Sequence, residues 1–571
     1  MTLHNCNFEI VETRCTVSLL FTLAIILFPP LGAMNGVAQP KIIRGPYLQM
    51  PASSGIIIRW RSDTTTTSRV DYSLNPSLTP ATTLTDTTLT TEHKIQLSGL
   101  SAFTRYYYAV GSITQLLSGP DSLHWFKTSP VIGTVQPVRI WAIGDFGNGS
   151  TNQKKVRDAF TNYNGSNHLD IWLWLGDDAY GDGTDAEYQS NVFDTTYSYG
   201  NIFKHYPFMP SPGNHDYNSV CLEPFCVISP YNHTGPYYDI IDVPTNGEIG
   251  GVASGLEAFY SYNYGNIHFL SLNSELGSVL ADSCDWIGSM DSVNFFNSPL
   301  YTWLVNDLSA NQQKWTIAYW HQIPYSKGSH DAGSFSEWFM TAMRKNILPI
   351  LEQYGVDVVL GGHSHNYERS YLINGFYGAI TSWDTDSMVV DINSGKDWMT
   401  PSQAYKKYTY GPEKNLGTVY MVGGNSGKTT DPPPTLDHPA MYYGHGCDSC
   451  AGSIVIDING NRLDAKYLTA WGAIYDDFTI IKIDSLSSVS ELTPVSADRN
   501  ILRPCNRGTV LEFPGKQVNK SKTNPVLFDL FGRQVLLPVR TEPGWMVDCG
   551  KLSQGIYYFR QETAVEKIIV Y

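Results

Sequence analysis

Residues 171–180 read Ile-Trp-Leu-Trp-Leu-Gly-Asp-Asp-Ala-Tyr, an apolar run that ends in a glycine and two aspartates. Similar apolar runs occupy residues 138–143, 267–272, 315–320, 356–360 and 419–422. Between them, residues 300–308 and 336–354 have the spacing of amphipathic helices. This alternation of short buried strands with helices predicts an α/β layer, and we expect residues 137–485 to form that domain.

Polar clusters lie where these apolar runs end. Four of them directly follow a run, at residues 144–147, 176–180, 321 and 361–365, and a fifth occupies residues 213–216. In an open α/β sheet the carboxyl ends of neighbouring strands converge on one crevice, so residues far apart in sequence can meet there. A Gly-Asp turn or a strand-end histidine is commonplace by itself. In combination, Asp, Asn and His form an oxygen and nitrogen donor set suited to two cations that share one carboxylate.

From residue 140 to residue 424 the sequence resembles the purple acid phosphatases, a subgroup of the calcineurin-like metallophosphoesterases. General metallophosphoesterases place a histidine two residues after the first aspartate, where this chain has Gly147. The purple subgroup has a tyrosine ligand three residues after the bridging aspartate, and Tyr180 stands in that position relative to Asp177. The resemblance implies an α/β fold of the metallophosphoesterase type, a four-layer β-sandwich flanked by helices.

The resemblance also implies the ligands of two metal ions. One ion would be bound by Asp145, Asp177, Tyr180 and His365. The other would be bound by Asp177, Asn214, His321 and His363, so that Asp177 bridges the pair. A phenolate and carboxylates are hard anionic donors that favour Fe(III), whereas neutral Asn and His suit a divalent ion, which could be iron, zinc or manganese.

Two histidines are predicted to act on the substrate. Two adjacent ions can clamp a phosphoryl group and turn a bound water into hydroxide for in-line attack. His215 matches a family position that contacts phosphate, and Asp216 could orient its ring. His330 is similar to the other substrate-side histidine of the family, with an exposed loop residue as the alternative interpretation.

Other polar residues near these clusters are interpreted as structural. Asp178 and Asp182 would either contact the metal ligands without binding metal themselves or be exposed to solvent. Glu368 and Arg369 would form an ion pair or hydrogen bonds close to the last ligands. Residues 379–415 form an insertion to which no motif assigns a role.

Residues 41–130 are expected to form a separate all-β sandwich. Residues 56–60, 69–72 and 105–110 are strand-like runs separated by Ser, Thr, Pro and Gly. The stretch 97–106 resembles the tyrosine-corner region of fibronectin type III sandwiches, and Trp60 would be a core residue there.

The two ends of the chain indicate export. An apolar stretch at residues 17–28 and the small residues before Gln39 predict a signal peptide over residues 1–38. The acidic residues ahead of it leave a misassigned start codon or a buried core segment as alternatives. Residues 495–571 are expected to form a C-terminal β module with strands at residues 526–530, 555–560 and 567–571. Residues 530–533, 555–558 and 567–570 resemble the C-terminal sorting domains of the bacterial type IX secretion system, which implies that secretion machinery as a partner. No later segment reaches transmembrane length, so we expect a secreted or cell-surface protein.

Seven of the nine cysteines would remain in the mature chain. Three pairs are candidates for disulfides in an oxidising compartment, which leaves Cys284 over: Cys221/Cys226, Cys447/Cys450 and Cys505/Cys549. Cys447 and Cys450, flanked by His438 and His445, could instead bind zinc or form a redox motif.

A formal net charge of −15 without a basic stripe argues against nucleic acid as a structural partner. The sequence therefore predicts an exported dinuclear metal phosphatase that hydrolyses small phosphomonoesters by metal-hydroxide attack, with an acidic pH optimum. The alternatives are a phosphodiesterase or nucleotidase that uses the same site, and a surface binding protein in which the metals are only structural.

Overall fold

The computed structural model describes residues 39–194, 199–217, 235–275, 295–430, 435–447 and 449–484, and the backbone of short strands between residues 502 and 570. The predicted signal peptide and four cysteines lie outside the described residues: Cys221, Cys226, Cys284 and Cys549. Within the described part of the chain, no helix is long and apolar enough to cross a membrane.

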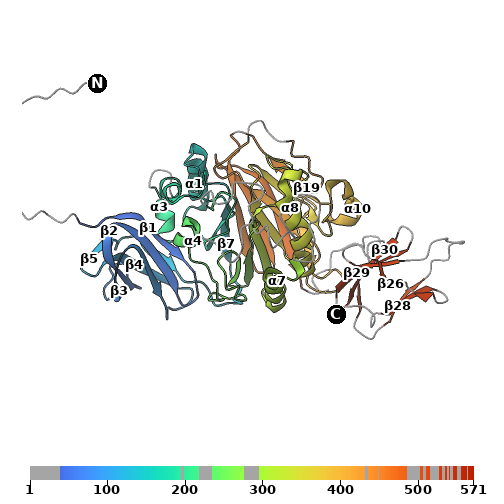
Figure 1. Cartoon of the computed structure of the whole chain (residues 1–571), viewed down its shortest axis with the longest axis horizontal. Coiled ribbons are helices and arrows are strands. Elements are labelled where there is room, and N and C mark those ends of the chain that lie inside the picture. The colour runs from blue at the N-terminus through green and yellow to red at the C-terminus, as the bar shows by residue number, and fades with distance from the viewer. Residues whose placement is uncertain are drawn as a thin grey trace, which may run out of the picture. The chain divides into compact units, whose positions relative to one another are not determined.

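An N-terminal β-rich domain, blue in Figure 1, precedes the α/β region. Its strands are β1 (Ile42–Gln49), β2 (Ile56–Ser73), β3 (Thr82–Leu97), β4 (Arg105–Ser112), β5 (Gln115–Ser118) and β6 (Trp125–Lys127). The runs predicted at residues 56–60 and 69–72 belong to one long strand, β2, because its pairing with β3 continues through register shifts between Arg61 and Ser68.

The core of this domain contains the expected aromatic residues. Trp60 is fully buried and stacks on His93 with ring centroids 4.8 Å apart. The backbone N–H of Ser101 donates to the hydroxyl of Tyr106 at 2.9 Å, as in a tyrosine corner.

Two mixed sheets of seven strands form the α/β region. The first runs in the order β10 (Tyr260–Tyr264), β11 (Ile267–Ser271), β12 (Trp315–Gln322), β13 (Val358–Gly362), β18 (Val419–Gly423), β14 (Tyr367–Ser370) and β19 (Met441–His445). The second runs β17 (Tyr405–Tyr408), β22 (Ile474–Ile483), β21 (Arg462–Thr469), β20 (Gly452–Asn459), β7 (Val138–Ile143), β8 (Ile171–Trp174) and β9 (Phe208–Pro210). All six apolar runs predicted as strands lie in these sheets.

The two faces of the first sheet pack differently because successive side chains of a strand point to opposite sides. Phe269, Ile317 and Leu360 share a core with residues of the second sheet. Their neighbours Leu270, Ala318 and Val359 pack instead with α7 (Pro299–Ala310), α8 (Trp338–Ala342) and α9 (Leu348–Gln353). Helix α7 confirms the helix predicted at residues 300–308.

The helix predicted at residues 336–354 is broken into short pieces. The 3₁₀ turn η2 (Phe335–Glu337) leads into α8, the π-helical turn η3 (Met343–Ile347) and α9. Pro349 explains the break before α9, because proline has no N–H to donate to the preceding turn and its ring crowds that turn.

The insertion at residues 379–415 contributes an edge strand. It contains η4 (Ile380–Ser382), α10 (Thr385–Met388), β16 (Val389–Asp391), which pairs with β15 (Leu372–Ile373), and β17, which pairs in parallel with β22. Lys407 of β17 is fully buried and lies 2.8 Å from Asp357, and Lys482 lies 2.8 Å from the other oxygen of the same carboxylate. The insertion is therefore joined to the body of the domain by a buried charge cluster.

The backbone between residues 502 and 570 forms two small sheets. The first contains β23 (Leu502–Cys505), β30 (Ala564–Val570), β29 (Gly555–Gln561), β25 (Val526–Asp529) and β26 (Gln534–Leu536). The second contains β24 (Val510–Pro514), β28 (Gly544–Asp548) and β27 (Val539–Arg540). The strands expected at residues 526–530, 555–560 and 567–571 are present as β25, β29 and β30.

Candidate metal centre

The predicted ligands lie at the carboxyl ends of strands from both large sheets. Asp145 follows β7, Asp177 follows β8, His321 lies near the end of β12, and His363 directly follows β13. Asn214 follows the short strand β9, which was not recognised in the sequence. Asp145 and Asp177 have φ of 54° and His363 has φ of 69°. Three non-glycine residues in this left-handed region, all in one cluster, indicate backbone strain of the kind that functional sites retain.

Two glycines of the polar clusters allow the backbone to approach the carboxylates. A Cβ added to Gly213 would lie 2.3 Å from Oδ1 of Asp177, and one added to Gly362 would lie 2.4 Å from Oδ2 of Asp145. Both distances are far below van der Waals contact, so only glycine fits at these positions.

Tyr180 joins the two aspartates. Its hydroxyl oxygen lies 2.9 Å from Oδ1 of Asp145 and 2.7 Å from Oδ2 of Asp177, so its single proton is shared between the two carboxylates. On the outer side of Asp145, Nε2 of His365 lies 3.5 Å from Oδ1. Asp145, Asp177, Tyr180 and His365, the four ligands predicted for the ferric ion, are therefore adjacent.

His321 gathers the remaining ligands. Its Nε2 lies 3.3 Å from Oδ1 of Asp177, 3.0 Å from Oδ1 of Asn214 and 3.3 Å from Nδ1 of His363. Its Nδ1 lies 3.0 Å from the carbonyl oxygen of Leu175, to which it can donate, and such a contact fixes the ring so that Nε2 faces the centre. The structure thus brings all seven predicted ligands into one continuous cluster around Asp177.

The charges of this cluster fit a cation site. Burial first, and then the charges of Asp145 and Asp177, raise the pKa of Tyr180 well above its ordinary value. Burial alone would lower the pKa of His321, but Asp177 and Asp145 raise it to about 10. Without metal ions, these raised pKa values favour a protonated phenol and imidazole, which can bond to the carboxylates. Metal ions bound to the same atoms would displace those protons, which is the usual coupling of metal binding to deprotonation.

His215 lies beside the cluster. Its ring centroid is 4.7 Å from that of Tyr180, its Nδ1 contacts the carbonyl oxygen of Gly181, and its Nε2 is 3.9 Å from Asp177. Its backbone N–H also donates to Asp177 at 2.9 Å. A partly exposed ring held through Nδ1 leaves Nε2 free to face a substrate.

The interpretation that Asp216 orients this ring is wrong. The buried Asp216 carboxylate accepts hydrogen bonds from the backbone N–H groups of Gly213 and Asp178, at 2.8 and 3.0 Å, and from the hydroxyl of Tyr188 at 2.7 Å. These bonds occupy Asp216 in holding together the loops that carry the ligands.

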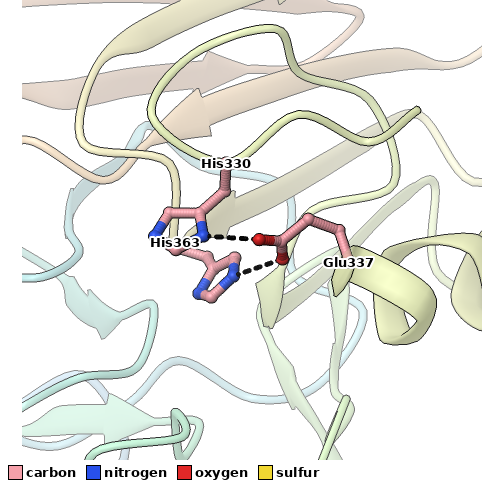
Figure 2. Close-up of side chains that lie close together, drawn as sticks. All are labelled: His330, Glu337 and His363. Atoms are coloured by element: carbon pink, nitrogen blue, oxygen red, sulfur yellow. Dashed lines mark hydrogen bonds and ion pairs between the residues drawn. The ribbon is translucent and has the colours of Figure 1, made fainter. Parts of the chain in front are cut away.

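His330 reaches the centre through a residue that sequence reasoning missed. Figure 2 shows the Glu337 carboxylate between two imidazoles: Nδ1 of His330 is 2.8 Å from Oε1, and Nε2 of His363 is 3.0 Å from Oε2. The rings of His330 and His363 lie 3.8 Å apart. His330 is a loop residue with a side chain 31% exposed, as the alternative interpretation expected, but its ring contacts a predicted ligand. No apolar strand precedes Glu337, so the pattern that located the other clusters gave no signal for it.

Lys428 was also missed, although the same pattern could have located it. It follows β18 through the sequence Gly-Asn-Ser-Gly. Its backbone N–H donates to the carbonyl oxygen of Asp145 at 2.9 Å, and its Nζ lies 4.4 Å from the centroid of the Tyr180 ring. This places a cationic side chain next to the predicted ligands.

Of the residues interpreted as structural, Glu368 and Arg369 have separate partners, whereas the side-chain oxygens of Asp178 have no hydrogen-bond partner among the described residues. Asp178 is fully buried, so a solvated role is wrong; burial and the charges of Asp216 and Asp177 raise its pKa well above the ordinary value. Glu368 and Arg369 do not pair with each other. Glu368 accepts from Asn366 at 2.9 Å, whereas Arg369 donates to the buried Asp476.

Cys447 and Cys450 form a disulfide with Cα atoms 4.9 Å apart. The flanking histidines pack on aromatic rings: His438 lies against Tyr325 and Phe376, and His445 against Tyr475. These contacts favour the disulfide over the zinc or redox interpretation.

A first testable prediction concerns Glu337. In Glu337→Gln, the amide oxygen can accept from only one of the two imidazoles, while its NH₂ group faces the other. We expect metal affinity or kcat/KM to fall by about 10- to 100-fold, as for other carboxylates that orient a metal-bound histidine. Kinetics together with metal analysis measure this. Glu352→Gln, which alters a buried carboxylate bonded to Tyr420 instead, is the matched control. Activity within twofold of the parent would contradict the orienting role.

Comparisons with known proteins agree with this geometry. Residues 138–367 match the family described as calcineurin-like phosphoesterase, and residues 43–129 match the purple acid phosphatase N-terminal domain. The chain thus joins a purple acid phosphatase N-terminal domain to a calcineurin-like metallophosphoesterase domain. The phosphoesterase match ends just beyond the predicted ligands His363 and His365.

Curated relatives are similar over part of their length. Purple acid phosphatase 15 of Arabidopsis thaliana is 26% identical over 303 residues, which cover 49% of this chain and 49% of the relative. A nucleotide pyrophosphatase/phosphodiesterase of Hordeum vulgare is 26% identical over 261 residues, covering 43% of this chain and 63% of the relative. The chain therefore spans about half the length of the first relative and less than two thirds of the second.

A solved structure shows the same fold. Purple acid phosphatase PPD1 from yellow lupin seeds superposes with a TM-score of 0.52 at 15% identity, covering 81% of this chain and 78% of that one. The metallophosphoesterase fold with an N-terminal β-rich domain is thereby confirmed.

Proposed function

We propose that this protein is a dinuclear metal phosphoesterase that hydrolyses phosphomonoesters, with Fe(III) between Asp145, Asp177, Tyr180 and His365 and a divalent ion between Asp177, Asn214, His321 and His363. The observation that carries the proposal is the convergence of these side chains, with contacts of 2.7 to 3.5 Å from one to the next. The similarity to purple acid phosphatases supports the same reading.

The chain's own residues would divide the work on the substrate. When bound, the metal ions supply Lewis-acid charge neutralisation and acidify the attacking water. His215, held at Nδ1 by Gly181, presents Nε2 on the side of Tyr180 and can give a proton to the leaving alcohol. His330, held at Nδ1 by Glu337, presents its own Nε2 in the same way. An imidazole must be protonated to act as an acid, so we propose an acidic pH optimum.

The direct test is metal analysis of the purified chain, its visible absorption spectrum and p-nitrophenyl phosphate hydrolysis. We expect two metal ions per chain, one of them iron, a charge-transfer band from the Tyr180 phenolate, and activity that falls toward alkaline pH. Tyr180→Phe should remove the colour. Absence of iron and of the band from a folded protein would overturn the metal assignment. Bound metal without turnover of any phosphate ester would favour the binding-protein alternative.

Lys428 favours a monoester over a diester as substrate. A phosphomonoester can carry two negative charges where a diester carries one, and an ammonium group beside Tyr180 attracts the dianion more strongly. We expect Lys428→Gln to raise KM for p-nitrophenyl phosphate by roughly tenfold, the equivalent of about 1.4 kcal/mol. The change for the bis-ester should be smaller, and Lys428→Arg should retain most of the affinity. An equal effect on both esters would contradict this preference. Faster hydrolysis of the bis-ester by the parent enzyme would favour the phosphodiesterase alternative, which the barley relative also suggests.

We also propose that the enzyme acts outside the cytoplasm. The Cys447–Cys450 disulfide supports an oxidising compartment. Fractionation of the producing cells tests the proposal, since recovery of the activity from the cytoplasm alone would contradict it.

A further inference from the structure

A short helical segment, residues 184–193, lies between the N-terminal β-rich domain and the metal-centre loops. It consists of α2 (Asp185–Glu187), which begins with a capping box between Thr184 and Glu187, and the π-helical turn η1 (Tyr188–Phe193). Side chains about one helical turn apart share a face, so this linking segment presents different residues to its two neighbours.

One face binds the N-terminal domain. The Arg61 guanidinium donates to both carboxylate oxygens of Asp185, at 2.6 and 2.7 Å. Arg44, whose side chain is fully buried, donates to Asp185 at 3.0 Å and to the side-chain oxygen of Gln189 at 2.9 Å. Gln189 returns a bond to the carbonyl oxygen of Ile43 at 2.7 Å. Asp185 and Gln189 are four residues apart, as a shared helical face requires.

The other face binds the loop that carries Tyr180. The Glu187 carboxylate accepts from the backbone N–H groups of Gly181 and Asp182, at 2.5 and 3.1 Å. Asn191 donates to the carbonyl oxygen of Tyr180 at 2.8 Å. The two peptide groups that follow Tyr180, between residues 180 and 181 and between 181 and 182, are therefore held by the linking segment.

The same face also reaches the loop that carries His215. Tyr188 donates to the Asp216 carboxylate at 2.7 Å, and the carbonyl oxygen of Gly181 is the partner of Nδ1 of His215. A displacement of the segment would therefore move both Tyr180 and His215.

We propose that the N-terminal β-rich domain positions residues of the metal centre: through Arg44 and Arg61 it holds residues 184–193, and these in turn position Tyr180 and His215. The inference rests on the proposed phosphoesterase activity. Arg44, Arg61 and Asp185 are positioning residues, since none of them contacts the predicted ligands in the part of the chain that the structure describes. Misplacing a reacting group by about 1 Å can lower a rate on the order of 10²-fold, so a modest shift of the segment is sufficient.

The contact can be weakened without unfolding the chain. The Asp185 side chain is 47% exposed, but its partner Arg44 is fully buried, so the substitution must leave Arg44 a hydrogen-bond acceptor. Arg61 also pairs with Glu92, and an asparagine at position 185 can still accept one bond from Arg44. Asp185→Asn is therefore expected to disturb geometry more than folding.

The test compares Asp185→Asn with Arg59→Gln in the full chain. Arg59 also belongs to the N-terminal domain, but its ion pair, 3.1 Å to Asp242, and its bond to the Asp239 carbonyl lead away from the linking segment. We expect Asp185→Asn to lower kcat for p-nitrophenyl phosphate by roughly 10- to 100-fold, with metal content unchanged and KM within about twofold. Arg59→Gln should leave kcat unchanged. Its Tm should nevertheless fall by at least as much as the Tm of Asp185→Asn.

A double variant separates positioning from general damage. Residues that act through one contact are not additive, so Arg61→Gln combined with Asp185→Asn should lower kcat no further than the worse single variant. Parental kcat in Asp185→Asn, or an equal loss in Arg59→Gln, would overturn the inference while leaving the proposed function intact. Absence of turnover in the parent protein would instead refute the proposed function. In that case the Tyr180 absorption band still reports whether Asp185→Asn, and not Arg59→Gln, alters the centre.

Discussion

His215→Ala is expected to lower kcat for an alkyl phosphomonoester such as glycerol phosphate by about 10²- to 10⁴-fold, the range typical of a lost general acid. The alanine removes Nε2, which is positioned to protonate the leaving group. It retains the backbone N–H that donates to Asp177 at 2.9 Å, and His215 is not one of the predicted metal ligands. The metal content and the visible spectrum should therefore persist while turnover is lost.

The control for this experiment is His445→Ala, which removes a partly buried histidine that packs on Tyr467, Trp471 and Tyr475. It should leave kcat unchanged. Loss of metal from His215→Ala would show that the ring supports the centre structurally. Parental turnover with metals bound would exclude a catalytic role for this side chain.

The second large effect is expected from Asp177→Asn. Asp177 contacts Tyr180 and His321, the residues on its two sides, and it is the carboxylate predicted to bridge the ions. An amide is neutral and has one oxygen, so it can neither bridge two cations nor balance their charge. We expect at least one ion to be lost. Activity should fall further than the 10- to 100-fold that is typical when a residue bonded to a metal ligand is replaced.

Metal analysis, the visible spectrum and p-nitrophenyl phosphate turnover measure the result for Asp177→Asn. Asp178→Asn is the matched control, since Asp178 is the adjacent aspartate, is fully buried, and has a pKa raised well above the ordinary value. Asp178 is not one of the predicted ligands, so the metal content of Asp178→Asn should change little. A fully metallated, active Asp177→Asn enzyme would refute the bridging role.

The sequence predicted the parts of the site that depend on local pattern. An apolar run followed by Gly and Asp located Asp145 and Asp177, because a buried strand must end in a turn and its carboxyl end faces the crevice. Tyr180 was predicted from its spacing to Asp177 through the family resemblance. The six strands of the α/β region were predicted for the same local reason: continuous apolar runs bounded by turn residues.

The parts that depend on contacts between distant segments could not be predicted. Glu337 ends the 3₁₀ turn η2, inside the segment predicted only as a helix, and its function appears only when folding places His330 and His363 on its two oxygens. The prediction for Asp216 was wrong because its position next to His215 in the sequence suggested a contact between the two side chains. In the fold, the Asp216 carboxylate bonds to Gly213, Asp178 and Tyr188 instead. Arg44 and Arg61 lie on ordinary strands, and nothing local indicates that Asp185 is their partner.

The edge strand contributed by the insertion has a consequence for how the protein behaves in solution. Without β17, the ten-residue strand β22, rich in isoleucine and aromatic residues, would end the second sheet and present its unpaired backbone to other chains. In its place the sheet ends in four residues, Tyr-Lys-Lys-Tyr, with Lys406 exposed. Short, lysine-bearing edges resist strand-to-strand association, so we expect residues 379–415 to limit association of the chain through this edge.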